Sequence, residues 1–594
     1  MDKKSIIILA VCFGLFVAMN SLVPKLFPPI PRPAAPTNAV ASASAPGQNN
    51  VAPQASAPTA SISASTTPVF AVAPNVREEL AVLKNENARY TFTSHGGGLK
   101  LVELVRYPET VSRRRAETQA DRFATLNTRA PAPVLALLGS DGLQEDGVFK
   151  LTQSYSTIRA EKTLSNGLTI VKEFQLGTNY LIEASVRIEN GTAETITLPT
   201  RELVIGTATP MSAEDDGMAV GISWYNGKAL ESMSSSHFSS RGFMCTPRTP
   251  PTEYRAGQSN VVWAAVHNQF FTLVAMPAEP SQEVVTRPIH LPPFPTDAAS
   301  GAPTRPLQGF QTALVYPQTT LNPGEKFERR IFLFAGPKEY QTLARIGERF
   351  RNNLDQVLGF DQMFPFYSLG GFFAKGLLLA MNTLHNALLV GYGWAIIIIT
   401  VIIKIIFWPL TRASTRSMKR LQALQPQMTA IKEKYKDDPL KAQKKTMEFM
   451  KENKVSPLGG CLPMLVQIPV FIAFFTMIRS AIELRGASFL WVADLSMPDT
   501  LFYIPGFNFP FNLLPLIMGV TMLWQAQITP VSPGADPMQQ KIMKYMPLMF
   551  LVFLYNFSAG LTLYWTVQNL LTIAQMKLTK AQPAAVSAVA KPKK

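Results

Sequence analysis

Cysteine is scarce in this chain, and acidic and histidine side chains are missing from its most apolar stretches. Three cysteines in 594 residues cannot build a disulfide framework, and they show no paired metal spacing. No Asp, Glu or His occurs in residues 392–410, 461–478, 509–528 or 546–576. Proton relays and intramembrane hydrolysis use titratable or nucleophilic groups at depth. Because no hydrolase nucleophile motif is present either, we expect no enzyme, no metal and no cofactor.

Apolar residues and positive charge are abundant instead. The chain is 47% hydrophobic, with a formal net charge of +16, so part of it should lie in lipid. Residues 411–460 hold twelve Lys or Arg against five Asp or Glu, whereas residues 483–508 hold three acidic residues against one arginine. The positive-inside rule places the first segment in the cytoplasm and the second outside. Topology and anionic lipid thus explain the charge, and we expect no direct nucleic-acid partner.

The amino-terminal 74 residues predict an anchor followed by a spacer. Residues 5–23 form an apolar run long enough to cross a bilayer, preceded by Lys3 and Lys4. A cleaved signal is the alternative, but no well-placed cleavage site follows. We therefore predict an uncleaved anchor with a cytoplasmic amino terminus. Residues 24–74 consist mainly of Pro, Ala, Ser and Thr, a composition typical of a tether.

Residues 76–337 contain short runs rich in β-formers, separated by turn signals. Asn-Gly pairs at 166–167 and 190–191 and Pro-Gly at 323–324 are typical of hairpins. The pattern predicts an antiparallel β-sandwich, with a polar helix over about 338–358. In residues 370–390 that follow, a narrow polar stripe of Lys375, Asn382 and Asn386 interrupts apolar residues. This favours an amphipathic helix in the membrane interface over a plain span.

The four apolar regions predict five further spans. Residues 546–576 are too long for one span, and Asn556 to Gly560 supply turn residues in the middle. The fold class is therefore multi-domain: a polytopic α-helical membrane protein, with one anchor plus a five-helix core, carrying an all-β periplasmic domain. In order, the predicted segments are the anchor 1–23, tether 24–74, β-sandwich domain with its carboxy-terminal helix 75–358, interfacial helix 359–391, second span 392–410, cytoplasmic hairpin 411–460, third span 461–482, periplasmic loop 483–508, fourth span 509–528, cytoplasmic loop 529–545, fifth span 546–557, sixth span 560–577 and basic cytoplasmic tail 578–594.

Lys404 is the one charged side chain in the four apolar regions. A lysine near the bilayer centre costs about 2.5–3.5 kcal/mol on insertion scales unless water or a polar cavity receives it. Snorkelling to head groups is the alternative, because the cytoplasmic end is about two turns away. Polar and aromatic residues at helical spacing could line a groove with Lys404: Thr400, Gln467, Thr521, Gln525, Tyr564, Trp565, Gln568 and Thr572. Dry interhelical hydrogen bonds remain an alternative to a wet groove.

The cytoplasmic segment predicts a helical hairpin. Its apolar residues repeat at three- and four-residue spacing before a Lys-Asp-Asp-Pro turn, and Pro426 should kink the first helix. The repeating residues are Leu421, Leu424, Met428, Ile431 and Tyr435. A solvated hairpin without a partner is the alternative.

Several motifs resemble those of the YidC-type membrane protein insertases, in the long Gram-negative form. The resemblance is carried by residues 393–411, by Val455-Ser-Pro-Leu-Gly-Gly-Cys-Leu-Pro463 to Pro469, and by Asp536-Pro-Met-Gln-Gln-Lys-Ile-Met543. Residues 94–100 and 224–228 add to it in the β-rich part. The resemblance implies a periplasmic β-supersandwich, a cytoplasm-open hydrophilic groove in the inner membrane, and insertion of proteins alone or beside the Sec translocon.

The same resemblance assigns roles and partners. Lys404 matches the groove cation of the family, which is commonly Arg, and Thr400 and Gln467 match polar groove positions. A lysine keeps the charge but lacks a bidentate fork. The implied partners are nascent inner-membrane proteins, the Sec translocon, membrane lipids, and the ribosome or signal recognition machinery. The tail is short and modestly basic, so ribosome binding there stays open.

Two other classes of function fit parts of the chain. A transporter or channel would show internal repeats or broken-helix sites at mid-membrane, and none is visible beyond Lys404. A glycan-binding envelope enzyme would use the β-sandwich, but no acid/base pair is evident in the sequence, and fold analogy alone cannot assign it. The insertase is therefore the function that we predict.

Overall fold

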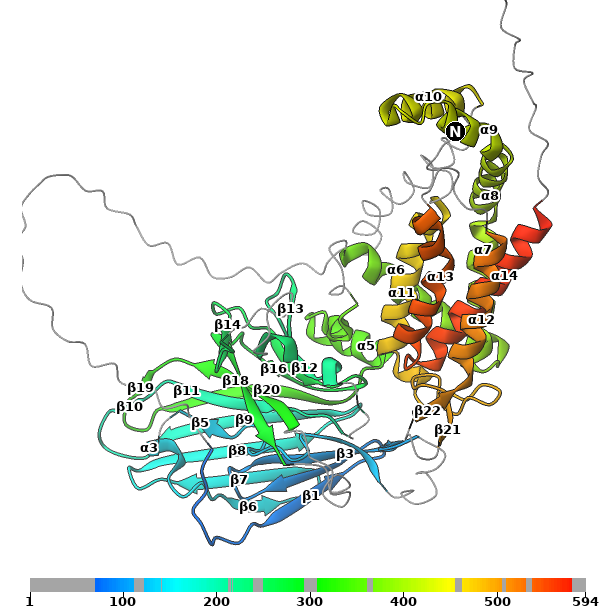
Figure 1. The fold of residues 1–594 in the computed structure, drawn as a ribbon. Coiled ribbons are helices and arrows are strands. Elements are labelled where there is room, and N and C mark those ends of the chain that lie inside the picture. The colour runs from blue at the N-terminus through cyan, green and yellow to red at the C-terminus, as the bar shows by residue number, and fades with distance from the viewer. Residues whose placement is uncertain are drawn as a thin grey trace, which may run out of the picture.

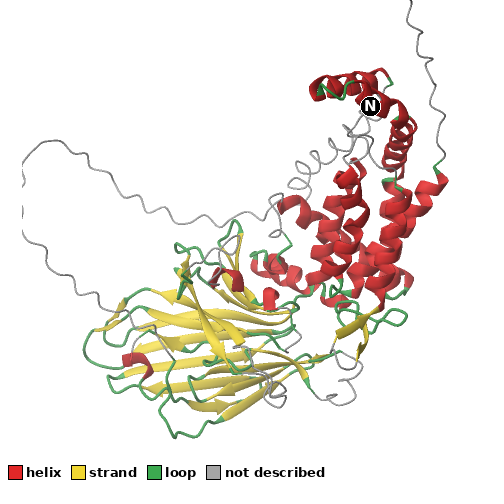
Figure 2. Cartoon of the chain, viewed as in Figure 1, coloured by secondary structure: helices red, strands yellow, loops and turns green. Residues whose placement is uncertain are grey.

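A β-rich part and a helical part lie side by side in the structure, a computed structural model (Figures 1 and 2). The structure describes residues 70–111, 122–139, 141–211, 215, 217–238, 249–292, 307–360, 367–453, 462–504, 509–529 and 537–579. The predicted anchor, nearly all of the tether, most of the carboxy-terminal tail and part of the 529–545 loop lie outside these residues. The expectation of a β-rich domain followed by a helical region is confirmed.

The largest sheet of the β-rich part is antiparallel and has nine strands. Its strands alternate between buried and more exposed residues, as in β7 and β9, because successive side chains of a strand point to opposite faces. Its strands are, in spatial order, β13 (Leu230–Ser234), β12 (Gly221–Tyr225), β15 (Trp263–His267), β16 (Phe271–Pro277), β20 (Lys326–Pro337), β9 (Leu181–Asn190), β8 (Leu168–Leu176), β7 (Thr157–Thr163) and β6 (Lys150–Gln153).

Smaller sheets pack against it. One has five strands in the order β14 (Tyr254–Ala256), β17 (Glu283–Leu291), β18 (Leu307–Tyr316), β11 (Arg201–Ala208) and β5 (Leu137–Leu138). Another has four, in the order β1 (Leu80–Lys84), β2 (Arg89–Thr93), β3 (Gly98–Pro108) and β4 (Phe123–Leu126), and β10 (Ile196–Leu198) pairs with β19 (Thr319–Leu321). One continuous core joins these sheets: Phe174, Trp263 and Leu314 come from different strands and are fully buried. Burial of the inward faces therefore stabilises a sandwich.

Short helical turns lie within the sandwich, and a longer helical part follows it. The turns are α3 (Asp141–Gln144), η1 (Gly217–Ala219) and η2 (Ser235–Phe238). The later helices are α5 (Tyr340–Phe350), η4 (Leu354–Leu358), α6 (Tyr367–Leu388), α7 (Tyr392–Ile406), α8 (Trp408–Ala423), α9 (Gln425–Lys434), α10 (Pro439–Glu452), α11 (Leu462–Ser480), η6 (Ile482–Leu484), α12 (Leu513–Ile528), α13 (Pro537–Leu554) and α14 (Ala559–Leu578). Helices α8, α9 and α10 lie at the end of the bundle farthest from the sheets (Figure 1).

Among the described residues, no single helix has both the length and the hydropathy that a membrane crossing requires. Segments Gly370–Leu388 and Tyr392–Ile406, from α6 and α7, meet that test together, and they are bent by 118° at the break between them. Shorter apolar stretches are Gln467–Ser480, Leu513–Ile528 and Tyr545–Leu554.

The structure differs from the sequence-based boundaries most clearly at the predicted fourth and fifth spans. Residues 509–512, which we assigned to the fourth span, form strand β22 (Phe509–Asn512), paired with β21 (Thr500–Ile504). Both runs are apolar and aromatic, so hydropathy could not separate a hairpin from the helix that follows. Helix α13 begins at Pro537, well before the fifth span predicted at 546, because hydropathy alone does not detect the polar first turns of a helix.

Two residues of the polar stripe of α6 make contacts within the chain. The ammonium of Lys375 pairs with a carboxylate oxygen of Asp355 at 3.1 Å. Asn382 donates to Glu483 at 3.0 Å. On its other side, Ala374, Leu378 and Met381 pack into the apolar core of the bundle. The stripe therefore joins α6 to the segments that connect the sandwich and the bundle.

Candidate functional site

Lys404 lies on the inward face of α7. Its side chain is 6% exposed, whereas its neighbours Ile402, Ile405 and Ile406 face outward and are exposed. The helix starts after Gly391, whose extended backbone turns the chain away from α6, and continues through a run of isoleucines. Helical geometry thus directs Lys404 toward the other helices of the bundle.

The Lys404 ammonium donates a hydrogen bond to the hydroxyl oxygen of Thr572 on α14, with an Nζ to Oγ1 distance of 2.7 Å. That hydroxyl uses its own proton to bond the Gln568 carbonyl at 2.7 Å, so its oxygen is free to accept. An ammonium has three donors, and Thr572 is its one hydrogen-bond acceptor among the residues that the structure describes. Two of its N–H groups therefore have no protein acceptor in this set.

Thr400 and Gln467 lie in the same bundle but do not bond Lys404. Thr400 is 1% exposed, and its hydroxyl donates to the Ile396 carbonyl of its own helix at 2.7 Å. The Gln467 side chain lies within hydrogen-bonding reach of the Tyr564 hydroxyl. The Thr400 hydroxyl oxygen keeps acceptor capacity, because only its proton is used.

The polar stripes of α12 and α14 meet each other. Asn569 donates to the Thr521 hydroxyl at 3.2 Å, which joins the two helices at buried positions. The side-chain oxygen of Gln525 is buried and has no partner within the described part of the chain. Gln568 is 8% exposed. A buried amide oxygen without a donor costs free energy, which a water molecule or a bound polypeptide would remove.

Tyr564 and Trp565, which we assigned to the polar stripe, pack mainly through their rings. The Tyr564 ring stacks on Phe474 of α11 with centroids 4.1 Å apart. The Trp565 ring meets Phe471 edge-on, with centroids 4.7 Å apart. These contacts hold α14 against α11.

The predicted site residues therefore fall into three groups. Lys404 of α7 bonds the Thr572 hydroxyl of α14, which in turn bonds the backbone carbonyl of Gln568 within α14. Thr521 joins α12 to α14, with Gln525 one turn further along α12. The remaining four, Thr400, Gln467, Tyr564 and Trp565, make contacts of their own within α7 or between α11 and α14.

Sequence reasoning missed Asn569, Thr411 and Lys419. Gln575 of α14 donates to the Thr411 hydroxyl at the start of α8, and Lys419 donates to the Met576 carbonyl at 3.0 Å. Thr411 follows Lys404 by seven residues, a spacing that keeps a residue on the same helix face. That spacing could have identified Thr411. Asn569 and Lys419 gave no signal, because their partners are distant in sequence.

The cytoplasmic hairpin forms a small separate cluster. Leu421, Leu424 and Met428 are buried with Met450 of α10. Ile431 and Tyr435, the other two predicted members, are half-buried. The chain breaks between α8 and α9 just before Pro426, and α10 starts with Asp438 accepting a hydrogen bond from the Lys441 backbone at 3.0 Å.

No cluster of three or more His, Cys, Asp or Glu side chains able to hold a metal exists among the described residues. The candidate site thus offers one cation, several hydroxyls and amides, and aromatic rings packed between α11 and α14. Such a set can attract acidic groups and hydrate polar ones, but it holds no nucleophile with an adjacent base.

Two family models match the chain. Residues 383–585 match the "60Kd inner membrane protein" family, and residues 80–364 match the "YidC periplasmic domain". Together they cover most of the sandwich and most of the bundle, apart from the larger part of α6.

Similar proteins carry related names. A "Membrane protein insertase YidC" of Citrifermentans bemidjiense is 33% identical over 82% of this chain and 83% of its own length. One from Neisseria meningitidis serogroup C is 42% identical over 45% of each chain. A solved "Active YidC insertase" covers 86% of this chain and 96% of its own at 19% identity, with a TM-score of 0.34. A galactose mutarotase related enzyme from Lactobacillus acidophilus reaches a TM-score of 0.28 at 10% identity, over 43% of this chain and 97% of its own. Neither structural score is high enough to carry an argument about function.

Proposed function

The chain belongs to the YidC family of inner-membrane protein insertases, and from this premise we propose that it inserts its substrates through a cytoplasm-open, water-containing groove beside Lys404. One observation carries the proposal: a buried ammonium has three donors and a single acceptor among the described residues. Water or the polar flank of a substrate would satisfy the other two. Gln525 supports the same proposal of a water-containing groove, since its buried side-chain oxygen accepts no hydrogen bond from the described residues.

The proposed topology has six spans. The anchor 1–23 and the helices α7, α11, α12, α13 and α14 would cross the inner membrane, with both termini in the cytoplasm. The sandwich, 75–358, would lie in the periplasm behind the tether 24–74, and α6 would lie in the interface. The basic composition of 411–460 supports a cytoplasmic position for α8, α9 and α10. Their location at the end of the bundle opposite the sheets supports it too (Figure 1).

The mechanism follows from charge and apolar burial. An incoming segment would meet the hairpin around Leu421, Leu424, Met428, Ile431 and Tyr435. Its hydrophilic flank would enter the groove near Lys404, Thr400 and Thr572, while its apolar helix moves into lipid. The groove would shorten the distance that the hydrophilic flank must cross through the lipid interior, and the positive charge would attract acidic residues of the flank. Apolar burial would supply the free energy, with the membrane potential assisting acidic flanks.

Nascent inner-membrane proteins would be the substrates. The Sec translocon, membrane lipids and the ribosome or signal recognition machinery would be partners. No covalent step is involved, in keeping with relatives that are named insertases. No observation of the fold specifically favours a transporter, a channel or a glycan-binding enzyme.

Reconstitution tests this function. The purified full chain in proteoliposomes should insert a single-span protein with an acidic translocated tail, scored by protection of that tail from added protease. Empty liposomes give the background. Equal protection with and without the protein would contradict the proposal, and solute flux without insertion would favour a transporter.

A further inference from the structure

A hairpin with an apolar and aromatic surface lies at the end of the bundle opposite α8, α9 and α10 (Figure 1). It consists of β21 and β22, which pair antiparallel with Phe502 opposite Phe511. The side chains from Leu501 to Ile504 are all exposed, and because successive residues of a strand point to opposite faces, both faces of β21 are open. Phe509 of β22 is exposed as well. A surface of this kind marks an interaction site.

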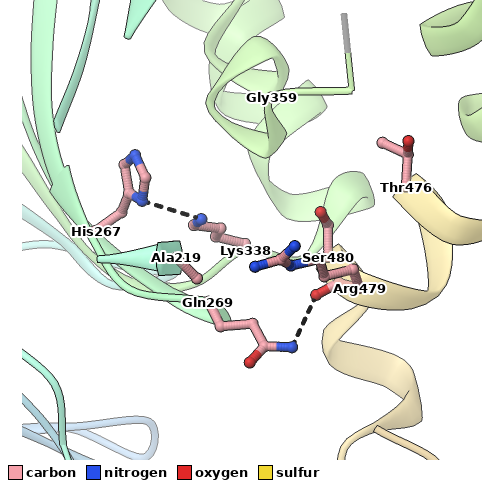
Figure 3. A pocket seen from close by; sticks show the side chains of 8 residues that line it. All are labelled: Ala219, His267, Gln269, Lys338, Gly359, Thr476, Arg479 and Ser480. Carbon is pink, nitrogen blue, oxygen red and sulfur yellow. Dashed lines mark hydrogen bonds between the residues drawn. The ribbon is translucent and has the colours of Figure 1, made fainter. Parts of the chain in front are cut away.

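The sandwich docks on the same end of the bundle. Figure 3 shows this contact, a cavity of ≈ 290 Å³ that is lined by Lys338 on the side of the sandwich and by Arg479 near the end of α11. The Gln269 side chain donates to the Arg479 carbonyl at 3.0 Å. Because the hairpin belongs to the segment that joins the end of α11 to the start of α12, it lies on the side of the sandwich. Under the proposed topology this is the periplasmic end of the bundle.

The base of the hairpin is fixed to two helices. Asn512, its last residue, directly precedes α12, and its backbone N–H donates to the hydroxyl of Tyr555 at 3.1 Å. Tyr555 follows the end of α13, and its hydroxyl donates in turn to the Pro510 carbonyl at 2.8 Å. The rings of Phe509 and Tyr555 stack with centroids 5.1 Å apart. The hairpin therefore keeps a fixed height relative to α12 and α13.

The chemistry of the surface favours lipid over water. Strand edges that face water usually carry charged side chains, yet no Asp, Glu, Lys, Arg or His occurs between Thr500 and Ala535. The uncharged surface continues along α12, where Val520 and Trp524 are exposed and face lipid under the proposed topology. Phenylalanine and tyrosine rings suit the same boundary, because a tyrosine ring is apolar while its hydroxyl stays hydrated.

Backbone hydrogen bonding sets the depth. A hairpin of two strands leaves the N–H and C=O groups of its outer edges unpaired, and such groups cost several kcal/mol each in hydrocarbon. Water among the lipid head groups satisfies them. An open hairpin is thus compatible with the interface and incompatible with the centre of the bilayer.

We propose that the β21–β22 hairpin inserts into the head-group region of the periplasmic leaflet, with Phe502, Tyr503 and Phe509 as its anchoring side chains. The inference rests on the proposed topology for the side of the membrane, and it does not involve the groove at Lys404. It also explains why hydropathy extended the fourth span back to residue 509: the strand shares the lipid environment of α12 without sharing its helical structure.

Spin labels in the full chain test this depth. A chain without its three native cysteines and carrying Phe502→Cys receives a nitroxide label in liposomes of phosphatidylethanolamine and phosphatidylglycerol. Collisions with oxygen, which concentrates in lipid, are compared with collisions with a water-soluble nickel chelate. Tyr155→Cys is the matched control, because it replaces a fully exposed aromatic residue in the turn between β6 and β7 of the sandwich. Val552→Cys, exposed on α13, gives the value for lipid.

We expect the ratio of oxygen to nickel collisions at Phe502→Cys to exceed that at Tyr155→Cys at least about fivefold, a difference of about 1 kcal/mol in the partitioning of the two reagents. The ratio should stay below that at Val552→Cys. Tyr503→Cys, on the opposite face of β21, should give a similar value and replaces Phe502→Cys if loss of the stacked Phe502 and Phe511 rings prevents folding.

A ratio at both hairpin positions equal to that at Tyr155→Cys would overturn the proposal. If Val552→Cys still reads as lipid, only the hairpin inference fails; if it also reads as water, the proposed topology fails with it. Few collisions with either reagent would place the hairpin against protein, such as a second copy of this chain, and would equally overturn insertion into lipid.

Discussion

Replacing Lys404 with methionine should separate the role of its charge from its role in packing. Methionine keeps the length of the side chain and removes the ammonium. The substitution forfeits the 2.7 Å bond to Thr572, a charged hydrogen bond contributing about 1.5–3 kcal/mol. It also relieves the cost of a lysine at depth, about 2.5–3.5 kcal/mol. These terms nearly offset each other, so we expect the Tm of Lys404→Met to equal or slightly exceed that of the wild type.

Insertion should respond quite differently. A carboxylate about 4 Å from the ammonium gains roughly 1 kcal/mol at the dielectric of water and roughly 4 kcal/mol at an effective value near 20. The smaller of these two energies, roughly 1 kcal/mol, alone corresponds to about a fivefold loss in the insertion rate when the charge is removed. We therefore expect Lys404→Met to lower insertion of a substrate with an acidic tail at least about fivefold.

The assay is protease protection in proteoliposomes, with initial rates compared at equal protein content. Lys404→Arg should retain activity because it keeps the charge. Lys577→Met is the matched control: it removes one positive charge from an exposed lysine of α14 whose ammonium lies 4.7 Å from the Trp524 ring centre. A substrate with neutral amides in its tail should insert at similar rates into all four proteins. Wild-type rates for Lys404→Met with the acidic substrate would refute charge attraction at this site.

Three further changes test the architecture by thermal unfolding of the full chain. Gly393→Ala should destabilise it by about 1–3 kcal/mol, because the added Cβ would lie 2.3 Å from Cδ2 of Phe489. Glu202→Gln should cost about 1.5–3 kcal/mol, since it removes the bidentate carboxylate of the buried Arg287 guanidinium, which keeps only its ion pair with Glu253 at 2.9 Å. Burial lowers the pKa of Lys338 in the folded chain to about 7, from the ordinary lysine pKa of 10.5 that applies in the unfolded chain. Between these two pH values the unfolded chain therefore binds more protons than the folded chain. Stability should therefore rise with pH across that window, by up to about 1.4 kcal/mol per unit, and Lys338→Met should remove this increment.

Matched variants give these predictions their controls. Gly391→Ala adds a Cβ that meets nothing within 4 Å, so its Tm should stay near wild type. Glu103→Gln alters an ion pair with Arg89 at the surface and should cost less than about 1 kcal/mol. Equal losses at Gly393 and Gly391, or at Glu202 and Glu103, would contradict the packing and ion-pair arguments. A pH slope unchanged in Lys338→Met would contradict the assignment of the proton to that lysine.

Local sequence patterns predicted much of the architecture. Alternating burial along β9 follows from the period of a strand, and the Asn-Gly pair at 166–167 forms the turn between β7 and β8 as expected. The single charge of Lys404 marked the inward face of α7. The sequence placed Thr572 among eight candidates near Lys404 but could not single it out as the hydrogen-bond partner, because Thr572 is 168 residues away and only the packing of α7 against α14 brings the two together.

Two features could not be predicted from the sequence, for different reasons. The β21–β22 hairpin has the same apolar composition as a span, so hydropathy extended the fourth span through Phe509 to Asn512. The cavity between the sandwich and the bundle needs Lys338 and Arg479 from opposite sides. Each residue alone is an ordinary cation near a helix end, and only the docking of α11 on the sandwich makes them neighbours.

Access of water to Thr572 tests the central claim most directly. A chain without its three native cysteines and carrying Thr572→Cys should react, in inside-out membrane vesicles, with a charged thiol reagent that cannot cross lipid. Ala473→Cys, a fully buried position in the apolar core of the bundle, gives the dry reference. The account predicts labelling of Thr572→Cys well above this reference from the cytoplasmic side. Labelling no faster than at Ala473→Cys would mean that the polar stripes pack dry, which would contradict a water-containing groove.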